Sequence, residues 1–461
     1  MSSHSDSKLE VLLYAELLAN IRQIRLFVTI VDPDCNTCSA LLTSQAPDSV
    51  PILELSPSRS TITVLYRDNN ISLQLPVPVS QRSREYLKAT GSTSIPFSGD
   101  HSSGLEHAFR LPIDETAVGT ERFPGLRDGY GSESPWSAKS MSPQTRISCR
   151  NCFNPIFTPQ PGQTVEWKDL PSADWAEMME LWHCHKPDPK ADQDVNLQEG
   201  KKNDHSSDLN EHVKGYGATN RVISEPGIIL VNVSSFVMVD DDCKGVKKLQ
   251  HLGTNSKEDK PSTTQEIVTL YCESCETEVG GVHNTLRGLE IFKAKAAVSK
   301  PTNATSGSNV TDDSFETYPT EIFIAAQLLE SIERTGARRF VIHSWTEESE
   351  RNTGLLIWVF NPDLRYSCNN NIPSIRRVAS GQRALKVFFQ SIPDVQSLVN
   401  PAIGTPAAAS LEEILLPWSI YTEAKSILTE SNSTLPPSAR KFKEWDVGLL
   451  NLFGEVDHKA V

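Results

Sequence analysis

The sequence predicts an α+β protein with a β-rich N-terminal region, a metal-stabilised core and a C-terminal α+β domain. Three observations support this: β-prone runs before residue 90, two Cys-x-x-Cys pairs around the middle, and mixed helix and strand patterns near the end. We expect sections at 1–90 (β-rich), 91–145 (mostly loop), 146–298 (core), 299–318 (linker) and 319–461 (α+β).

Composition narrows the class of protein. The 461 residues are enough for two or three domains, and 38% hydrophobic with 22% charged residues indicates that part of the length is loop. A net charge of −14 argues against direct nucleic-acid binding, which needs a surplus of Lys and Arg. No apolar run is long enough to span a membrane, so we expect no membrane partner.

The N-terminal segment lacks the basic and apolar regions of a secretory signal, because Glu10 and Glu16 interrupt its apolar residues. We therefore expect the protein to be located in the cytoplasm, the nucleus or both, where thiols stay reduced.

The N-terminal region reads as β structure. Ile24, Leu26, Val28 and Ile30 alternate with other residues, which predicts a strand, while the apolar residues before them fit helix or strand. Two β-prone runs, 60–66 and 71–75, flank a polar Asp-Asn-Asn turn and predict a hairpin.

In the core section, residues 187–220 carry almost no large apolar side chains, so we expect a disordered insertion. Residues 228–239 predict one buried strand, and 266–271 predict a strand that runs into Cys272.

The C-terminal section shows helix signals. Thr320 is placed to cap a helix over 321–334, and Gly336 is placed to end it. Strands are expected at 339–343, 355–360 and 384–389, followed by helices over 411–429 and 438–452.

The two Cys-x-x-Cys pairs predict a metal site. Each pair places two thiolates on one tight turn, and two such turns supply the four sulfurs of a structural zinc site. The alternative is that the pairs are unrelated, one redox-active and the other incidental. The predicted Zn²⁺ ligands are Cys149, Cys152, Cys272 and Cys275.

A short helix over 172–186 ends in further metal-binding residue types. Its Trp and Met residues recur at helical spacing, which indicates packing on the core. His183, Cys184 and His185 follow at the exit, where they have three alternative roles: packing, metal ligation, or a catalytic thiol at Cys184.

These features together resemble one family. The order of CRNC, LPSADWAEMMELWHCHK, YCESCETEVG and RRFVIHS…LLIWVFNPDLRYS resembles the HECT-like ubiquitin-conjugating-enzyme-binding proteins, in a fungal-type member. The segment from Cys272 to Gly280 also resembles the zinc knuckle of Yippee-type β-tent domains, which implies a β-tent-like core.

The family resemblance implies a ubiquitin-protein ligase that binds a ubiquitin-conjugating enzyme and promotes transfer of ubiquitin to a protein substrate. Whether the chain itself acts as an enzyme stays open. The alternative implied function is a non-enzymatic zinc-stabilised scaffold or chaperone for a client protein, in messenger-RNA 3′-end processing.

The candidate thiols for a ubiquitin thioester are Cys184 and Cys368. A HECT ligase carries its thiol near the end of a large C-terminal domain, whereas Cys368 is the last cysteine here. We therefore expect the chemistry to take place on a charged conjugating enzyme that docks on this chain.

Overall fold

The structure is a computed structural model, and it describes the chain over thirteen ranges. These are 10–32, 51–67, 69–89, 94–98, 103–114, 134–170, 223–251, 267–283, 286–299, 314–344, 353–369, 381–400 and 411–454. The expected insertion 187–220 and the expected helix 172–186 lie outside these ranges.

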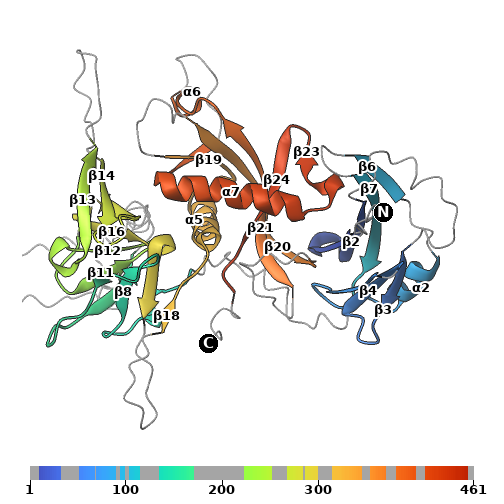
Figure 1. Cartoon of the computed structure of the whole chain (residues 1–461), viewed down its shortest axis with the longest axis horizontal. Helices are drawn as coiled ribbons and strands as arrows, with labels where there is room; N and C mark the ends of the chain where they lie inside the picture. Colours follow the sequence, from blue (N-terminus) through green and yellow to red (C-terminus); the bar gives the residue numbers. More distant parts are fainter. Residues whose placement is uncertain are drawn as a thin grey trace, which may run out of the picture. The chain divides into compact units, whose positions relative to one another are not determined.

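The chain forms two compact units, which Figure 1 shows in sequence colours. Unit 1 comprises 1–135, 251–267 and 318–461, and unit 2 comprises 136–250 and 268–317. Both units are built mainly of strands; among the described residues the α-helices lie in unit 1, whereas unit 2 has only short 3-10 turns between its strands. The whole chain is thus broadly consistent with the expected β-rich α+β class.

Unit 1 is organised around a ten-stranded sheet. Its main path runs β23-β24-β21-β20-β1-β2-β7-β6, and β19 branches from β20 and pairs with β22. The strands are β1 (Glu10–Leu18), β2 (Gln23–Asp32), β6 (Ser94–Ser98), β7 (Ser103–Pro112), β19 (Arg339–Ser344), β20 (Gly354–Cys368), β21 (Gln382–Ile392), β22 (Leu411–Leu416), β23 (Lys441–Phe442) and β24 (Trp445–Asn451).

The pairing of β1 joins the N-terminal strands of unit 1 to its C-terminal strands. One edge of β1 pairs with β2 along its whole length, and the other pairs with the end of β20, where Tyr14 faces Cys368. The apolar residues over Glu10–Leu18 are therefore a strand rather than a helix, and the alternating strand predicted at Ile24–Ile30 is confirmed as part of β2.

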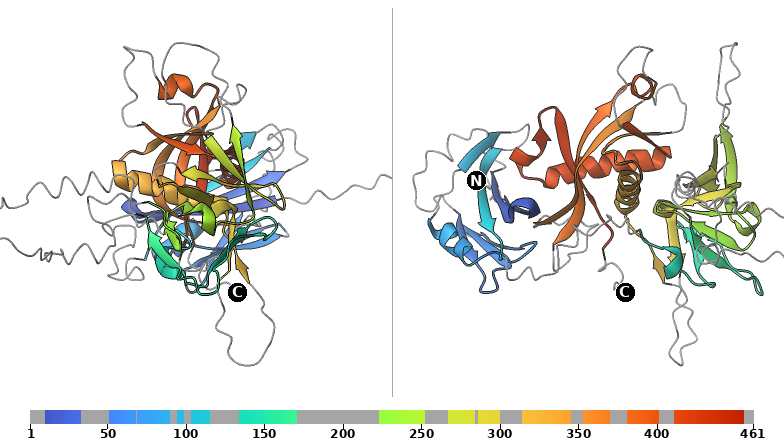
Figure 2. Two further views of the ribbon diagram at one scale, coloured as in Figure 1. Left: turned by 90° about the vertical axis from the view of Figure 1, so that its left-hand side faces the viewer. Right: turned by 180° about the vertical axis from the view of Figure 1, so that it is seen from behind.

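A small sheet and a helix cover part of this unit. The predicted hairpin is confirmed as β4 (Thr61–Tyr66) and β5 (Asn69–Gln74), with β3 (Ile52–Leu55) beside β4. Apolar residues of this sheet form one core cluster with those of β1, β2 and β7. Helix α2 (Arg82–Ala89) contacts β3 and β7, and the right-hand view of Figure 2 shows it beside the small sheet.

Two long helices pack on the C-terminal strands. Helix α5 (Thr320–Thr335) lies against β24 and α7 (Trp418–Thr434), and α7 lies against β24 and β19 (Figure 1). Gly336 ends α5 as predicted, in a left-handed conformation with its N–H donating to the Ile332 carbonyl. Thr320, predicted to cap this helix, instead donates its hydroxyl to Glu423 Oε1 at 2.6 Å.

Two helix predictions near the C-terminus are wrong in part. Residues 411–416 form β22, and α7 begins only after Pro417, because parallel pairing with β19 holds the first six residues extended. Residues 438–452 contain β23 and β24 instead of a helix, since their apolar side chains pack as a strand against β21. The short elements of this unit are η1 (Ala19–Ile21), α6 (Gln396–Val399) and η8 (Pro437–Ala439).

Unit 2 contains two sheets. One has seven strands in the order β10-β11-β12-β16-β15-β14-β13, and the other has four in the order β18-β17-β8-β9. The strands are β8 (Arg146–Cys149), β9 (Pro155–Phe157), β10 (Glu166–Asp169), β11 (Ile228–Val231), β12 (Ser235–Met238), β13 (Val246–His251), β14 (Ile267–Cys272), β15 (Glu278–His283), β16 (Gly288–Phe292), β17 (Ala296–Ser299) and β18 (Phe315–Glu316), with the turns η4 (Ala138–Ser140), η6 (Asp240–Asp242) and η7 (Lys293–Lys295).

The single strand predicted over 228–239 is in fact the hairpin β11–β12. A polar turn interrupts it, where the Asn232 side chain accepts from the Val233 N–H and the Asn232 N–H donates to Ser235. Asn and Ser side chains satisfy backbone groups locally and so favour a turn over a continuous strand.

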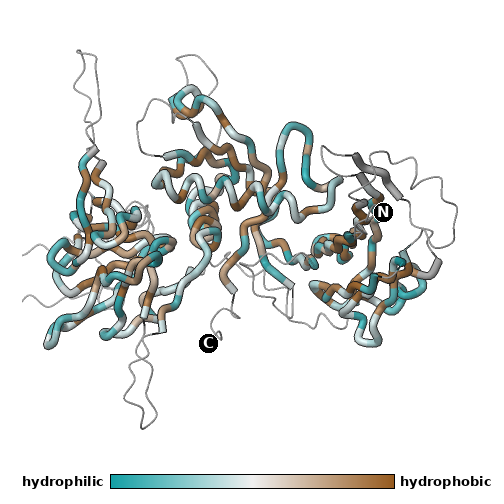
Figure 3. The backbone as a smooth tube through the Cα atoms, in the orientation of Figure 1, coloured by the Kyte–Doolittle hydropathy of each residue, from teal (hydrophilic) through white to brown (hydrophobic). Residues whose placement is uncertain are grey.

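Hydropathy follows the packing in both units. Figure 3 shows apolar residues concentrated along α5 and alternating with polar residues along many strands. Within the described part of the chain, no helix has the length and apolar character needed to cross a membrane.

Candidate metal centre

The first Cys-x-x-Cys pair lies on the turn between β8 and β9. Cys149 ends β8, its N–H donates to the Asn154 carbonyl, and its own carbonyl accepts from the Phe153 N–H at 2.8 Å. Phe153 follows Cys152 directly and has a left-handed φ of 59°. These bonds close the chain into a tight knuckle that points both thiols the same way.

The second pair lies on the turn between β14 and β15 and repeats this pattern. Cys272 ends β14, its N–H donates to Thr277, and its carbonyl accepts from the Glu276 N–H at 2.9 Å. Glu276, directly after Cys275, has a φ of 56°. The two knuckles thus share one backbone conformation, although their sequences differ.

The four sulfurs meet in one cluster. Sγ of Cys149 lies 3.6 Å from Sγ of Cys275, and Sγ of Cys152 lies 3.6 Å from that of Cys272. All four lie within 4.8 Å of one another. Tetrahedral zinc with sulfur at about 2.3 Å requires sulfurs separated by roughly 3.8 Å, so the cluster fits this metal.

The cluster connects the two sheets of unit 2. β8 belongs to the four-stranded sheet and β14 to the seven-stranded sheet. Two of the sulfurs are in buried residues and two in half-buried ones. A metal held here would therefore cross-link two sheets whose ligands are far apart in sequence.

The thiols differ in electrostatic environment. Burial raises the pKa of Cys149 to about 12 and also raises that of Cys152. A hydrogen bond with Thr277, whose Oγ1 lies 3.3 Å from Sγ, is the main reason that the pKa of Cys275 falls to about 6. A bound cation favours the thiolate form of all four, because thiolates are the metal-ligating species.

Several supporting residues were missed at the sequence level. The Asn151 side chain donates to Thr277 Oγ1 at 3.2 Å, so the two knuckles share a hydrogen bond beside Cys275. The only sequence signal for Thr277 was its place two residues after a cysteine.

Gly245 supports both knuckles through one carbonyl. That oxygen accepts from the Asn154 side chain at 3.3 Å and from the Glu273 N–H at 2.9 Å. A Cβ at Gly245 would lie 2.6 Å from the Pro155 carbonyl oxygen, and its φ is +66°. Only glycine fits this position without displacement of the backbone.

The other predicted site residues are not part of this cluster. His183, Cys184 and His185 lie outside the described residues, so their role stays a prediction. Cys368 ends β20 in unit 1, where it is partly buried against the core that contains Tyr14 and Tyr366.

Comparison with known proteins gives a family match over residues 16–447, to the family described as "HECT-like Ubiquitin-conjugating enzyme (E2)-binding". "Uncharacterized protein YJR141W" of Saccharomyces cerevisiae is 23% identical over 352 residues, which cover 76% of this chain and 80% of that protein. "Uncharacterized protein C1734.10c" of Schizosaccharomyces pombe is 24% identical over 333 residues, covering 69% and 77% respectively.

No solved structure matches the chain significantly. The family match, however, includes all four cysteines of the cluster and nearly all of both units. The chain belongs to the HECT-like ubiquitin-conjugating-enzyme (E2)-binding family.

Proposed function

We propose that this chain binds a ubiquitin-conjugating enzyme and promotes the transfer of ubiquitin from that enzyme to a protein substrate. The observation that carries the proposal is the match to an E2-binding family over residues 16–447. The partners are then a charged conjugating enzyme, its ubiquitin and a protein substrate.

The four-cysteine cluster has a structural role in this proposal. All four corners of the tetrahedron are filled by protein sulfurs, so a bound zinc has no open position for water or substrate. Zinc would supply folding free energy and fix the two sheets of unit 2.

The transfer chemistry is placed on the partner. A substrate lysine amine attacks the thioester carbonyl of the charged enzyme, an isopeptide bond forms, and the enzyme's cysteine leaves as a thiol after proton transfer. This chain contributes by holding enzyme and substrate together, which raises the effective concentration of the amine.

A thioester relay through this chain would need an accessible thiol. Cys368 is a weak candidate, because it is partly buried and the adjacent Asn369 is tied to β1 through bonds with Leu13 N–H and the Val11 carbonyl. Reaching Cys368 with a ubiquitin thioester would require this end of β20 to open.

The test uses the purified, zinc-loaded full chain and a panel of conjugating enzymes. Binding is measured by calorimetry, and each enzyme charged with ubiquitin is then mixed with the chain and analysed on non-reducing gels. We expect at least one enzyme to bind, without a reducible ubiquitin adduct on the chain.

A reducible adduct that disappears in Cys368→Ser or Cys184→Ser would show that ubiquitin forms a thioester with this chain, and it would contradict the docking mechanism. Absence of binding to every enzyme in the panel would refute the proposal and leave the client-scaffold interpretation.

A further inference from the structure

A group of aromatic side chains emerges at the surface of unit 1 where β20, β21 and the β23–β24 hairpin meet. Phe360 is 56% exposed and Phe442 is 45% exposed. Between them lies the buried Phe388, with ring centres 5.0 Å from Phe360 and 4.9 Å from Phe442. We call these three rings the aromatic patch.

The patch rests on a rigid base. Trp358 packs edge-on against Phe388 with ring centres 5.5 Å apart, and it also contacts the buried Trp445. The rings of Phe388 and Phe442 are nearly parallel, at 9°. Since these positions are fixed before any partner arrives, a partner that covers the rings loses little binding energy to ordering them.

The hairpin beside the patch has a strained tip formed by Lys443 and Glu444. Residues 441–444 are all exposed, and Lys443 has a φ of 56° in the two-residue loop between β23 and β24. Glycine or asparagine is preferred at such a position. The Lys443 ammonium lies 5.9 Å from the ring centre of Phe442, so charge and aromatic surface are adjacent.

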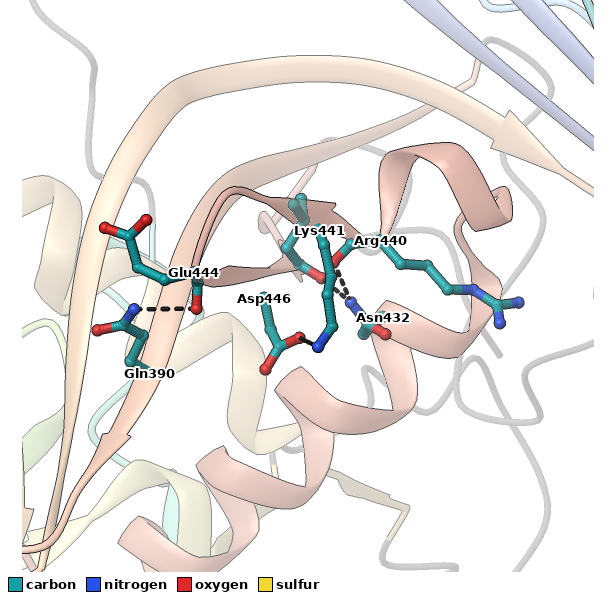
Figure 4. Close-up of polar contacts among 7 residues, drawn as sticks. Gln390, Asn432, Arg440, Lys441, Glu444 and Asp446 are labelled. Carbon is teal, nitrogen blue, oxygen red and sulfur yellow. Dashed lines mark hydrogen bonds and ion pairs between the residues drawn. The ribbon is translucent and has the colours of Figure 1, made fainter. Parts of the chain in front are cut away.

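Figure 4 shows how the hairpin is held in place. The Glu444 carbonyl accepts from the Gln390 side chain at 3.0 Å, and Lys441 pairs with Asp446 at 3.8 Å. The hairpin backbone is therefore fixed to β21, whereas the Lys441 side chain is 76% exposed and accessible to a partner's carboxylate.

Exposed aromatic rings on a packed base are typical of protein-binding interfaces, in which Phe, Tyr and Trp are enriched relative to the rest of the surface. Strain at an exposed turn also persists more often where it serves a function. The patch lies wholly within the residues that match the E2-binding family.

Charge distinguishes two proteins that could cover the aromatic patch: a second copy of this chain and a different protein. The chain carries −14, yet residues 440–446 (RKFKEWD) contain three cations and two carboxylates, which is a local excess of one positive charge. In a symmetric dimer of this chain the lysines of one patch would face the same lysines of the other, whereas an apolar partner surface bordered by carboxylates complements them.

We propose that the aromatic patch and the tip of the β23–β24 hairpin form the docking surface for the ubiquitin-conjugating enzyme. This inference rests on the proposed function. The enzyme would cover Phe360 and Phe442 and place carboxylates next to Lys441 and Lys443.

The experiment measures dissociation constants of the full, zinc-loaded chain with the conjugating enzyme that binds most tightly in the panel. Phe442→Ala and Phe360→Ala are each expected to weaken binding tenfold or more. Leu415→Ala is the matched control, because Leu415 is 47% exposed on β22 of the same sheet, and it should stay within twofold of wild type.

Lys443→Gly separates docking from folding. Glycine relieves the left-handed strain and should raise the melting temperature, yet loss of the cation should weaken binding severalfold. Lys441→Glu should also weaken binding, and its effect should shrink at high salt.

Three outcomes would overturn the proposal. If the wild-type chain binds an enzyme and the Phe variants bind equally well, the docking surface is elsewhere while the proposed function stands. If no enzyme binds the wild type, both fail. If sedimentation shows a wild-type dimer that Phe442→Ala dissociates, a second copy covers the patch instead.

Discussion

At the scale of single residues, Gly245 has the strongest constraint near the metal centre. Its carbonyl joins the two knuckles, and a side chain would meet the Pro155 oxygen and the Asn154 amide. We predict that Gly245→Ala lowers the free energy of unfolding by roughly 2–4 kcal/mol. Chemical denaturation of the zinc-loaded chain measures this.

Gly162→Ala is the control for this prediction. Gly162 also has a positive φ, of 83°, but no atom lies within 4 Å of the position that a Cβ would take there. Only the left-handed strain applies at this residue, at about 1 kcal/mol. Equal losses for the two variants would show that Gly245 is not packed between the knuckles.

Lys293 is a buried charge in unit 2 and makes the stability depend on pH. Its side chain is 1% exposed, with the ammonium 5.2 Å from the ring centre of Phe236. Burial lowers the pKa of Lys293 to about 7, and Asp169 partly opposes this. In the unfolded chain the pKa is near ~10.4.

The sign of this pH dependence follows from how many protons the folded and the unfolded chain bind. Between pH ~7 and ~10 the unfolded chain holds a proton that the folded chain has released, so the free energy of unfolding rises with pH. We predict a contribution of up to about 1.4 kcal/mol per pH unit in this window, which Lys293→Met removes. Lys295→Met, at a half-buried position on the same turn, should keep the slope; an unchanged slope in Lys293→Met would contradict the prediction.

At the scale of elements, Asn432 ties helix α7 to the β23–β24 hairpin. Its amide donates to the carbonyls of Arg440 at 2.7 Å and Val447 at 2.8 Å. Figure 4 shows the bond to Arg440 next to the Lys441 pair. We predict that Asn432→Ala costs about 1–2 kcal/mol of stability and speeds hydrogen exchange in β23 and β24.

Ser433→Ala removes an exposed hydroxyl one residue further along α7 and should change stability by less than about 0.5 kcal/mol. If hairpin exchange were as fast in this variant as in Asn432→Ala, the tie would not depend on the Asn432 amide.

The same elements show how far the sequence predicts the fold. The β4–β5 hairpin and the end of α5 at Gly336 follow from local turn and cap chemistry, and both are confirmed. The local pattern over 438–452 predicts a helix, and this is wrong because pairing with β21, a segment distant in sequence, makes most of these residues strand.

The site was partly predictable for the same reason. Cys-x-x-Cys spacing marks each knuckle locally, and the structure brings the two pairs together. Gly245 and Thr277 carry no comparable local signal, because their roles arise from contacts between segments distant in sequence. Local sequence patterns give no signal for the pairing of β1 with β20 either, because these strands are far apart in the sequence.

At the scale of the whole molecule, all four sulfurs lie in unit 2, so metal removal should act there first. We predict that chelation, or Cys275→Ser, lowers one thermal transition by more than about 10 °C. Hydrogen exchange should rise in 136–170, 268–283 and 286–299, while 354–368 and 382–392 keep their protection.

Cys243→Ser is the matched control, because Cys243 is half-buried in unit 2 but is not in the cluster. It should bind metal like the wild type. Equal metal content in Cys275→Ser and the wild type would contradict the assignment of this cluster as the metal site.

The proposed function is also a property to be tested on the whole chain, since the family match spans both units. The most direct measurement is single-turnover discharge of a ubiquitin-charged conjugating enzyme, followed with and without the zinc-loaded chain in the presence of a lysine acceptor. We predict that the chain accelerates loss of the thioester tenfold or more for at least one enzyme, with ubiquitin joined to the acceptor. Discharge rates that stay at the enzyme-alone value across the panel would contradict the account.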